Sequence, residues 1–283
     1  MAAGRVSLMP APETTASADG WAARLELGFR EQAGRTVLSH RRRFGPLAVQ
    51  RPFYPEGETC HVYVLHPPGG IAGGDTLDID LDLPAGHALI TTPGAAKFYR
   101  SSGPLAEVGQ RLRVGAGARL EWLPQENIIF PGACLRAGTR LDLVGDARAL
   151  LWEIHCFGRP VIDEAFTHGN AGFSLSVARD GEPLLEERLR VTESSLGRRA
   201  LLAGRPVTGT LIATGCDSAL LDRVRGLLPG GGEFAATRLD DLLALRYLGG
   251  STEQCRKVFT AAWQVLREPV LDKPAQLPRV WAT

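Results

Sequence analysis

The sequence predicts a mainly β protein in which strands stack in successive, helix-like layers and two α-helices follow near the C-terminus. Three observations support this fold class. One segment alternates strictly between apolar and acidic residues, a strand-and-turn pattern recurs about every thirty residues, and helical spacing of apolar residues is confined to the last third. The 283 residues suffice to bury a sizeable core.

The clearest strand is TLDIDLDL, residues Thr76–Leu83. Its leucines and isoleucine fall on one face, whereas Asp78, Asp80 and Asp82 fall on the other. Such period-two alternation over eight residues is typical of a half-buried strand, because a helix would mix the two sets. A Pro-Ala-Gly turn follows, and residues 87–92 resume as a strand.

The same pattern recurs around Leu81, Leu112, Leu141 and Leu175, where the chain reads LDLPAGHAL, LRVGAGARL, LDLVGDARA and LSVARDGEP. Each copy is a short alternating strand with a turn that contains glycine. This imperfect repeat predicts hairpins or coils that bury a shared core between neighbours. Asp180-Gly181, in the last copy, is the strongest hairpin-turn signal.

Two helices are expected in the last third. The first is centred on residues 220–228, with Asp217 or Ser218 as N-cap and Gly230 just beyond its end. The second covers Thr252–Glu268 and is expected to stop at Pro269.

The N-terminal side of the second helix carries a capping box formed by Ser251 and Gln254. Between the two helices, residues 242–248 are apolar and fit either a buried strand or a short helix, and periodicity does not decide between them.

Composition excludes several classes of protein. The net charge of +1 lacks the basic surplus of a nucleic-acid binder, and no apolar run is long enough for a membrane helix. Five scattered cysteines without a CxxC pair, and no signal peptide, predict a cytoplasmic location. Residues 1–20 are predicted to be a flexible arm and residues 21–283 a single domain.

The segment HPPGGIAGGD, residues 66–75, is compatible with a phosphate cradle, a metal site or a sharp structural corner. It lacks the Gly-Lys-Ser/Thr ending of a phosphate-binding loop, and a strand rather than a helix follows it. A corner is therefore the favoured interpretation, with Asp75 at its exit as a cap for backbone N–H groups or a contact for a partner.

Three further segments carry candidate residues. TTPGAAKFYRS supplies Lys97, Tyr99 and Arg100 on a turn, and EWLPQENIIF supplies Gln125 and Glu126 beside a tryptophan. In LLWEIHCFGRP, Glu153 and His155 share one strand face and Cys156 takes the other. Glu153 and His155 are either ligands for a metal such as nickel or hydrogen-bonded members of a half-buried strand.

These four segments, in this order and spacing, resemble the urease accessory protein D family (UreD, called UreH in some organisms). The likeness covers roughly residues 60–160, and the general layout extends it over most of the chain. It implies a β-rich stack of strands with a pair of helices. It also implies a non-catalytic protein that binds urease apoprotein and the helical partner UreF, which recruits the GTPase UreG, so that nickel reaches urease.

The resemblance gives the candidate residues roles. A nickel conduit needs weak, replaceable ligands, for which carboxylates and water suit better than several thiolates or imidazoles. The candidates for transient nickel passage are Asp75, Asp78, Asp80, Asp82 and Glu153. The candidates for partner contact are Lys97, Tyr99, Arg100, Gln125, Glu126 and Arg159, together with the C-terminal helices. No tightly bound cofactor is expected.

Two other classes remain open. A β-rich hydrolase would use Asp75 or Glu126 with His66 or His155 as acid and base. A metal-storage protein is disfavoured because cysteine and histidine are sparse and dispersed. A purely mechanical role, in which the chain opens urease for its metal, predicts the same motifs as a conduit.

Overall fold

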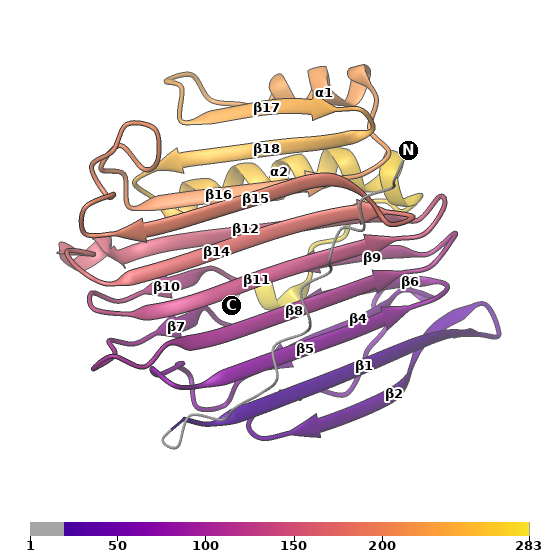
Figure 1. Cartoon of the computed structure of the whole chain (residues 1–283). Coiled ribbons are helices and arrows are strands. Elements are labelled where there is room, and N and C mark those ends of the chain that lie inside the picture. The colour runs from indigo at the N-terminus through magenta and orange to yellow at the C-terminus, as the bar shows by residue number, and fades with distance from the viewer. Residues whose placement is uncertain (1–19, 283) are drawn as a thin grey trace, which may run out of the picture.

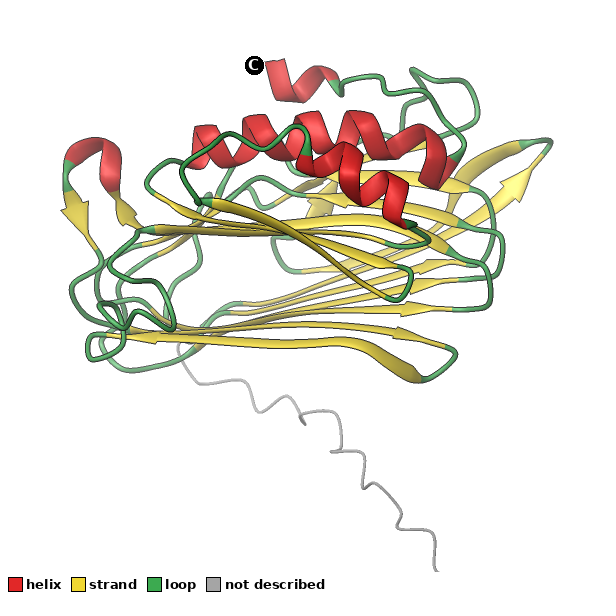
Figure 2. Cartoon of the chain, turned by 90° about the horizontal axis from the view of Figure 1, so that it is seen from above, coloured by secondary structure: helices red, strands yellow, loops and turns green. Residues whose placement is uncertain are grey.

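A computed structural model describes residues 20–282 of the chain. Apart from Gly20, the predicted N-terminal arm lies outside the described residues. Two stacked β-sheets form the body, and helices cover one outer face (Figures 1 and 2). The predicted fold class, mainly β with stacked strands and two α-helices, is confirmed.

The first sheet, called sheet 1, has seven strands in the order β15-β14-β11-β8-β5-β1-β2. Their bounds are β1 Ala22–Gln32, β2 Arg35–Phe44, β5 Thr76–Leu83, β8 Ala106–Val114, β11 Cys134–Leu143, β14 Asn170–Arg179 and β15 Glu182–Thr192. Figure 1 views the molecule from the side of sheet 1. The strand predicted at Thr76–Leu83 is thus confirmed as β5.

The second sheet, sheet 2, has the main order β17-β18-β16-β12-β9-β6-β4-β3. Its bounds are β3 Ala48–Val49, β4 Cys60–Leu65, β6 His87–Thr91, β9 Arg119–Leu123, β12 Arg148–Arg159, β16 Val207–Ala213, β17 Phe234–Leu239 and β18 Leu242–Gly249. Three short strands lie off this path. The strands β10 Asn127–Ile129 and β13 Glu164–Ala165 pair with β12, and β7 Ala96–Phe98 pairs with β10.

The thirty-residue repeat is a coil around the two sheets. Strands β5, β8, β11 and β14 lie parallel in sheet 1, while β6, β9 and β12 lie parallel in sheet 2, so the chain crosses between sheets in every repeat. Leu81 lies opposite Leu112, and Leu112 opposite Leu141. The fourth member of this row is Val177, two residues beyond the predicted Leu175. The two-residue offset keeps both side chains on the same face of the strand.

The first helix, α1, covers Ser218–Arg225, and the side chain of Asp217 caps it by accepting a hydrogen bond from the Leu220 N–H at 2.9 Å. It ends earlier than predicted, at a Gly226 C-cap, which leaves Leu227 partly exposed. The undecided segment after it is a strand, β18.

The second helix, α2, covers Thr252–Leu271, and the Ser251 side chain caps it as predicted. The prediction that Pro269 stops this helix is wrong. The helix continues to Leu271, which is fully buried, and Asp272 ends it in a left-handed conformation with φ of 55°. Burial of the last turn outweighs the missing N–H of the proline. Short 3-10 turns, η1 Pro160–Ile162 and η2 Arg279–Ala282, complete the secondary structure.

The fold contains two apolar layers. One lies between the sheets and holds the inward side chains of the repeat, such as Leu81 and Leu112. The other lies between sheet 2 and the helices, where Trp263 of α2 is fully buried. Within residues 20–282, no helix is both long and apolar enough to span a membrane.

Candidate functional site

Two cavities lie between the sheets, in a region where β strands normally pack without voids. The larger has a volume of about 510 Å³ and is lined mainly by apolar side chains. Its exposed lining residues, among them Pro67, Pro93 and Lys97, lie where it opens at one end of the sheets. The smaller, of about 350 Å³, is bordered by the exposed residues Ser174 and Arg188.

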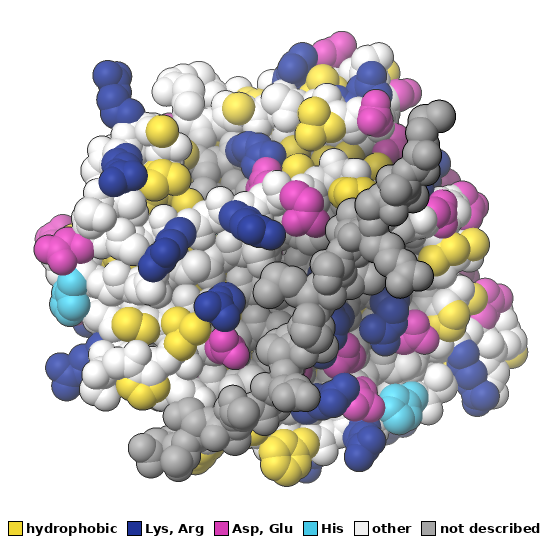
Figure 3. Space-filling view, in the orientation of Figure 1, with side chains coloured by type: hydrophobic (Ala, Val, Ile, Leu, Met, Phe, Trp, Pro, Cys, Tyr) yellow, Lys and Arg dark blue, Asp and Glu magenta, His cyan; other side chains and the backbone are white. Residues whose placement is uncertain are grey.

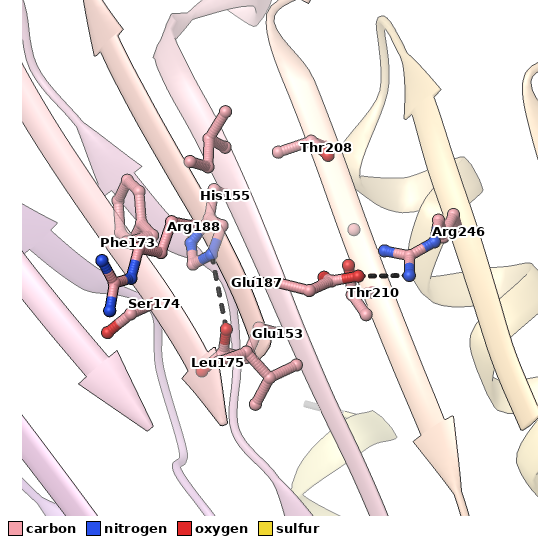
Figure 4. Close-up of a pocket in the computed structure, with 12 residues that line it drawn as sticks. Glu153, His155, Phe173, Ser174, Leu175, Glu187, Arg188, Thr208, Thr210 and Arg246 are labelled. Atoms are coloured by element: carbon pink, nitrogen blue, oxygen red, sulfur yellow. Dashed lines mark ion pairs between the residues drawn. The ribbon is translucent and has the colours of Figure 1, made fainter. Parts of the chain in front are cut away.

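Glu153 lines both cavities, and Figure 4 shows it among the residues of the smaller one. It stands on β12, where alternation directs Glu153 and His155 between the sheets and Cys156 toward the helices, as predicted. The rest of the inward face of β12 is apolar, with Leu151 and Phe157 in the core. A single carboxylate on the inner face of β12 therefore borders both hollow spaces.

A chain of polar side chains surrounds this carboxylate. The Thr139 hydroxyl lies within hydrogen-bonding distance of Glu153 and also 2.9 Å from the Gln110 Oε1 atom. One hydroxyl hydrogen serves only one acceptor at a time, so Glu153 and Gln110 compete for it. Among the described residues, Thr139 is the one hydrogen-bond donor to Glu153, and the nearest other donor is the His155 Nε2 atom at 3.7 Å.

His155 stands on the other side of Glu153. Its Nδ1 atom lies 3.1 Å from the amide nitrogen of Asn127, and its Nε2 atom lies 3.7 Å from the Glu153 carboxylate. With the amide as donor, Nδ1 is the acceptor and the proton of the neutral ring sits on Nε2. The ring stacks on Phe173 with centroids 3.9 Å apart, which fixes its orientation. In this state His155 offers no free nitrogen lone pair to a metal.

The larger cavity also contains a donor without a partner. Trp122 is 2 % exposed and lines this cavity, and its indole N–H has no hydrogen-bond partner within the part of the chain that the structure describes. A buried unpaired donor is costly, whereas a water molecule in the cavity would satisfy it. The cavity is thus suited to hold water beside Glu153.

Gln110, Thr139, Asn127 and Trp122 were not among the site residues predicted from the sequence. A signal was available for two of them. Gln110 and Thr139 occupy inward positions of β8 and β11, next to Leu112 and Leu141, and lie opposite each other in the sheet. A polar residue at an apolar position of a repeat is the observation that identifies such a site.

The aspartate ladder lies elsewhere. Asp78, Asp80 and Asp82 point away from the cavities on the outer face of sheet 1, where Figure 3 shows basic and acidic side chains intermixed. Arg111 donates two hydrogen bonds to Asp80 at 2.6 and 3.0 Å, and these bonds lower the pKa of the Asp80 carboxyl. None of the three lines either cavity. Nickel binding by them stays a prediction, and the structure does not bring them together with Glu153.

Asp75 caps backbone N–H groups of the glycine-rich corner, which is one of the two roles predicted for it. Its carboxylate accepts hydrogen bonds from the backbone N–H groups of Trp21 at 2.9 Å and Ala72 at 2.8 Å. Gly70 is required because a Cβ atom there would lie 2.0 Å from the Tyr99 ring. HPPGGIAGGD is therefore a structural corner, shaped to let an aromatic side chain lie against it.

The predicted partner-contact residues fall into two groups. Tyr99 and Arg100 follow the end of β7, Arg159 is the last residue of β12, and Lys97 lies on β7. Gln125 lines the larger cavity, and Glu126 forms an ion pair with Arg256 of α2 at 2.5 Å. Partner contact by any of them stays a prediction.

A second buried polar cluster, which we call the clamp, attaches α2 to sheet 2. Arg267 of α2 is fully buried and pairs with both Glu56 and Glu121. His61 contacts Glu56 at 2.6 Å, and His87 contacts Glu121 at 2.8 Å. Burial opposes ionisation of Glu56, but hydrogen bonds from His61 and Arg267 outweigh it and lower the pKa of Glu56 to about 2.

Neither cluster is a preformed metal centre. Among residues 20–282, no group of three or more histidine, cysteine or acidic side chains is arranged to hold a metal ion. The acid-base pairs required by the hydrolase alternative, Asp75 or Glu126 with His66 or His155, form no hydrogen bond in the described residues, since Asp75 and Glu126 are engaged as above and His155 contacts Asn127.

Comparison with known proteins identifies the family. The family model described as UreD urease accessory protein matches residues 22–282. The chain belongs to the UreD family of urease accessory proteins. The Urease accessory protein UreD of Klebsiella aerogenes is 49% identical over 266 residues, which cover 93% of this chain and 97% of that protein.

Two other UreD proteins are similar to this chain over most of their length. That of Pseudomonas putida (strain W619) is 48% identical over 270 residues, 93% of this chain and 95% of its own length. That of Alcanivorax borkumensis is 44% identical over 292 residues, 100% of this chain and 98% of its own length. The resemblance inferred from four short segments is thus confirmed over nearly the whole chain.

Proposed function

We propose that this UreD protein is a non-catalytic cytoplasmic scaffold that binds urease apoprotein and the UreF–UreG complex, and that nickel reaches urease through its two cavities past Glu153. The single observation that carries the nickel route is that Glu153 lines both cavities. Nickel is cargo in this proposal, held for a moment and then released.

The chemistry around Glu153 supports transit rather than storage. One carboxylate with vacant lone pairs and room for water attracts a divalent cation, while the neutral groups of Gln110, Thr139 and Asn127 add only weak oxygen ligands. Since the Nδ1 atom of His155 is engaged by Asn127, the ring is not free to bind nickel tightly. A cation would therefore exchange its ligands quickly.

The arrangement of the two cavities supports a nickel passage that runs through the space between the two sheets. The larger cavity opens beside Lys97, and the smaller one opens beside Arg188. In the smaller cavity, Glu187 forms an ion pair with Arg246 (Figure 4), which places a second carboxylate beyond Glu153. Two openings with a carboxylate between them are what a passage requires.

The test is Glu153→Gln in cells that express urease with its accessory proteins. We expect urease activation and the nickel content of urease to fall about tenfold or more, while pull-down of the partners through this chain is unchanged. Glu107→Gln is the matched control, because Glu107 is a partly exposed glutamate paired with Arg136 on the surface. Normal activation by the Glu153→Gln variant would contradict the nickel route.

The scaffold role has its own test. Tagged wild-type chain, co-expressed with urease subunits and the UreF and UreG partners, is expected to recover all of them in a pull-down that is analysed by mass. Recovery of none of them by soluble, folded protein would contradict the scaffold role whatever the outcome for Glu153.

A further inference from the structure

Three polar side chains border the cavities around Glu153. Glu153 itself lines both cavities, whereas Asn127 lines only the larger one and His155 only the smaller one. Strands β10 and β12 are parallel neighbours in which Asn127 lies directly opposite His155, so the register of the sheet holds these two residues side by side. A cation at Glu153 therefore has an imidazole ring beside it as well as a carboxylate.

Glu153 and His155 are spaced so that one metal ion can bind both. The His155 Nε2 atom lies 3.7 Å from a Glu153 carboxylate oxygen, along the dashed line in Figure 4. Divalent ions such as zinc bind imidazole nitrogen and carboxylate oxygen at about 2.0–2.2 Å, so ligand atoms up to about 4.2 Å apart can share one ion. Imidazole is also a suitable ligand for nickel. Distance alone would therefore permit a firmer site here than a carboxylate provides by itself.

The position of one proton prevents such a site. The Glu153 carboxylate accepts hydrogen bonds, and a ring nitrogen that faces it is stabilised as N–H and repelled as a lone pair. On the other side of the ring, the amide nitrogen of Asn127 lies 3.1 Å from Nδ1, where its N–H group donates to a lone pair. Both neighbours favour the tautomer with the ring proton on Nε2. In this tautomer the nitrogen that faces Glu153 has no lone pair for a metal.

The orientation of the ring is fixed as well. It stacks on Phe173 with centroids 3.9 Å apart and an interplanar angle of 27°, and its side chain is 8% exposed. A half-turn of the ring would break the hydrogen bond to Asn127 and place a C–H group against the amide. Within residues 20–282, the bond from Asn127 is the one hydrogen bond to this ring. The amide of Asn127 is therefore the group that selects which ring nitrogen carries the proton.

We propose that Asn127 is a positioning residue that keeps nickel exchangeable, because its amide holds the ring proton of His155 on Nε2 and denies the metal an imidazole ligand beside Glu153. This role rests on the nickel route proposed above and names the residue that keeps binding weak along it. Asn127→Asp should reverse the effect, since a carboxylate accepts the Nδ1–H group and leaves the Nε2 lone pair to a metal. Carboxylate–histidine–metal arrangements of this kind are common in proteins and strengthen metal binding.

The first measurement locates the ring proton in the wild-type, full-length chain. NMR of the chain with nitrogen-labelled histidine reports which ring nitrogen is bonded to hydrogen, and comparison with His155→Phe identifies the signals of His155. We expect hydrogen on Nε2 only. Hydrogen on Nδ1, whether alone or together with Nε2, would overturn the role of Asn127.

The second measurement is the nickel affinity of the purified full-length chain, by isothermal titration calorimetry with nickel alone as the probe. We expect Asn127→Asp to bind nickel about tenfold to a hundredfold more tightly than the wild type, the range that such partners of metal-binding histidines contribute. The matched control is Asn127→Asp combined with His155→Phe, which keeps the added charge and an aromatic ring beside Phe173 but has no imidazole. Circular dichroism and the unfolding midpoint check that each variant is folded.

The double variant should return the nickel affinity to that of the wild type. An unchanged affinity in Asn127→Asp, or an increase that persists in the double variant, would overturn the role of Asn127. In cells, Asn127→Asp is expected to lower urease activation, because nickel is retained in this chain. Normal activation by a variant that binds nickel more tightly would instead contradict the nickel route of the proposed function, and would leave the position of the ring proton as assigned.

Discussion

Sheet 2 carries a glutamate-histidine cluster on each of its faces, and the two clusters are built in opposite ways. On the helix side, Glu121 accepts from His87, Trp263 and Arg267, and none of its surface is exposed. On the inner side, Glu153 competes with Gln110 for the hydrogen of Thr139 and borders two cavities.

The difference shows which buried carboxylate is structural. A carboxylate whose lone pairs are all occupied by protein donors can accept neither water nor metal, and it fixes the elements that supply those donors. A carboxylate with vacant lone pairs beside an open space is poorly suited to hold the fold together and well suited to meet a ligand. The residue types are the same in both clusters, and the side chain of Glu153 is 14% exposed against 0% for Glu121, so the number of donors is the larger difference between them.

The largest expected effect is on the clamp. Arg267→Met leaves the buried carboxylates of Glu56 and Glu121 without their cation, and we expect the free energy of unfolding to fall by about 3–5 kcal/mol. Urea unfolding followed by circular dichroism measures it. The control is Arg246→Met, which removes a half-exposed ion pair with Glu187 and should cost about 1 kcal/mol or less. Equal losses in both variants would contradict the structural assignment of the clamp.

The next effect is on acid stability. The folded state holds the pKa of Glu56 at about 2, below its value in the unfolded chain, so the unfolded chain takes up the proton first. The stabilisation, up to about 3 kcal/mol, is present above pH about 4.5 and is lost as the pH falls toward 2.

Unfolding of the wild type and of Glu56→Gln at a series of pH values tests this linkage. The Gln variant should be less stable at neutral pH and lose less stability between pH about 4.5 and 2. Parallel curves for the two proteins would mean that the acid sensitivity originates outside the clamp.

A smaller effect of opposite sign is expected at Glu153. Glu153→Gln removes a poorly compensated buried charge, so the free energy of unfolding should stay unchanged or rise by about 1 kcal/mol, even as urease activation falls. Differential scanning calorimetry of the purified variant measures it. A loss of several kcal/mol would assign Glu153 to the structural class, together with Glu121.

The smallest effect is expected at the aspartate ladder. Asp80→Asn weakens the ion pair with the half-exposed Arg111, and the free energy of unfolding should fall by about 1 kcal/mol or less. Because Asp80 lies on the outer face of sheet 1 and lines no cavity, urease activation should be unchanged. An activation defect as large as that of Glu153→Gln would place a nickel site on this face instead.

The sequence by itself determined the repeat and its consequence. Leucines recur at every second residue within a strand and about every thirty residues along the chain. Strands with this pattern bury their leucines together in a shared core. The sequence also determined that Glu153 and His155 share one strand face and that Ser251 caps a helix, because both features depend on local spacing. The order and spacing of four short segments indicated the family. These features follow from interactions between neighbours in the chain.

Only the tertiary structure decided which polar residues form a common hydrogen-bonded network. Glu56, Glu121 and Arg267 are up to 211 positions apart, and no local pattern predicts that they share one buried network. The end of α2 beyond Pro269 depends on burial of its last turn against sheet 2, which outweighs the proline. The cavities and the outward position of the aspartates depend on how two sheets stack, because packing between distant segments sets the space left to each side chain.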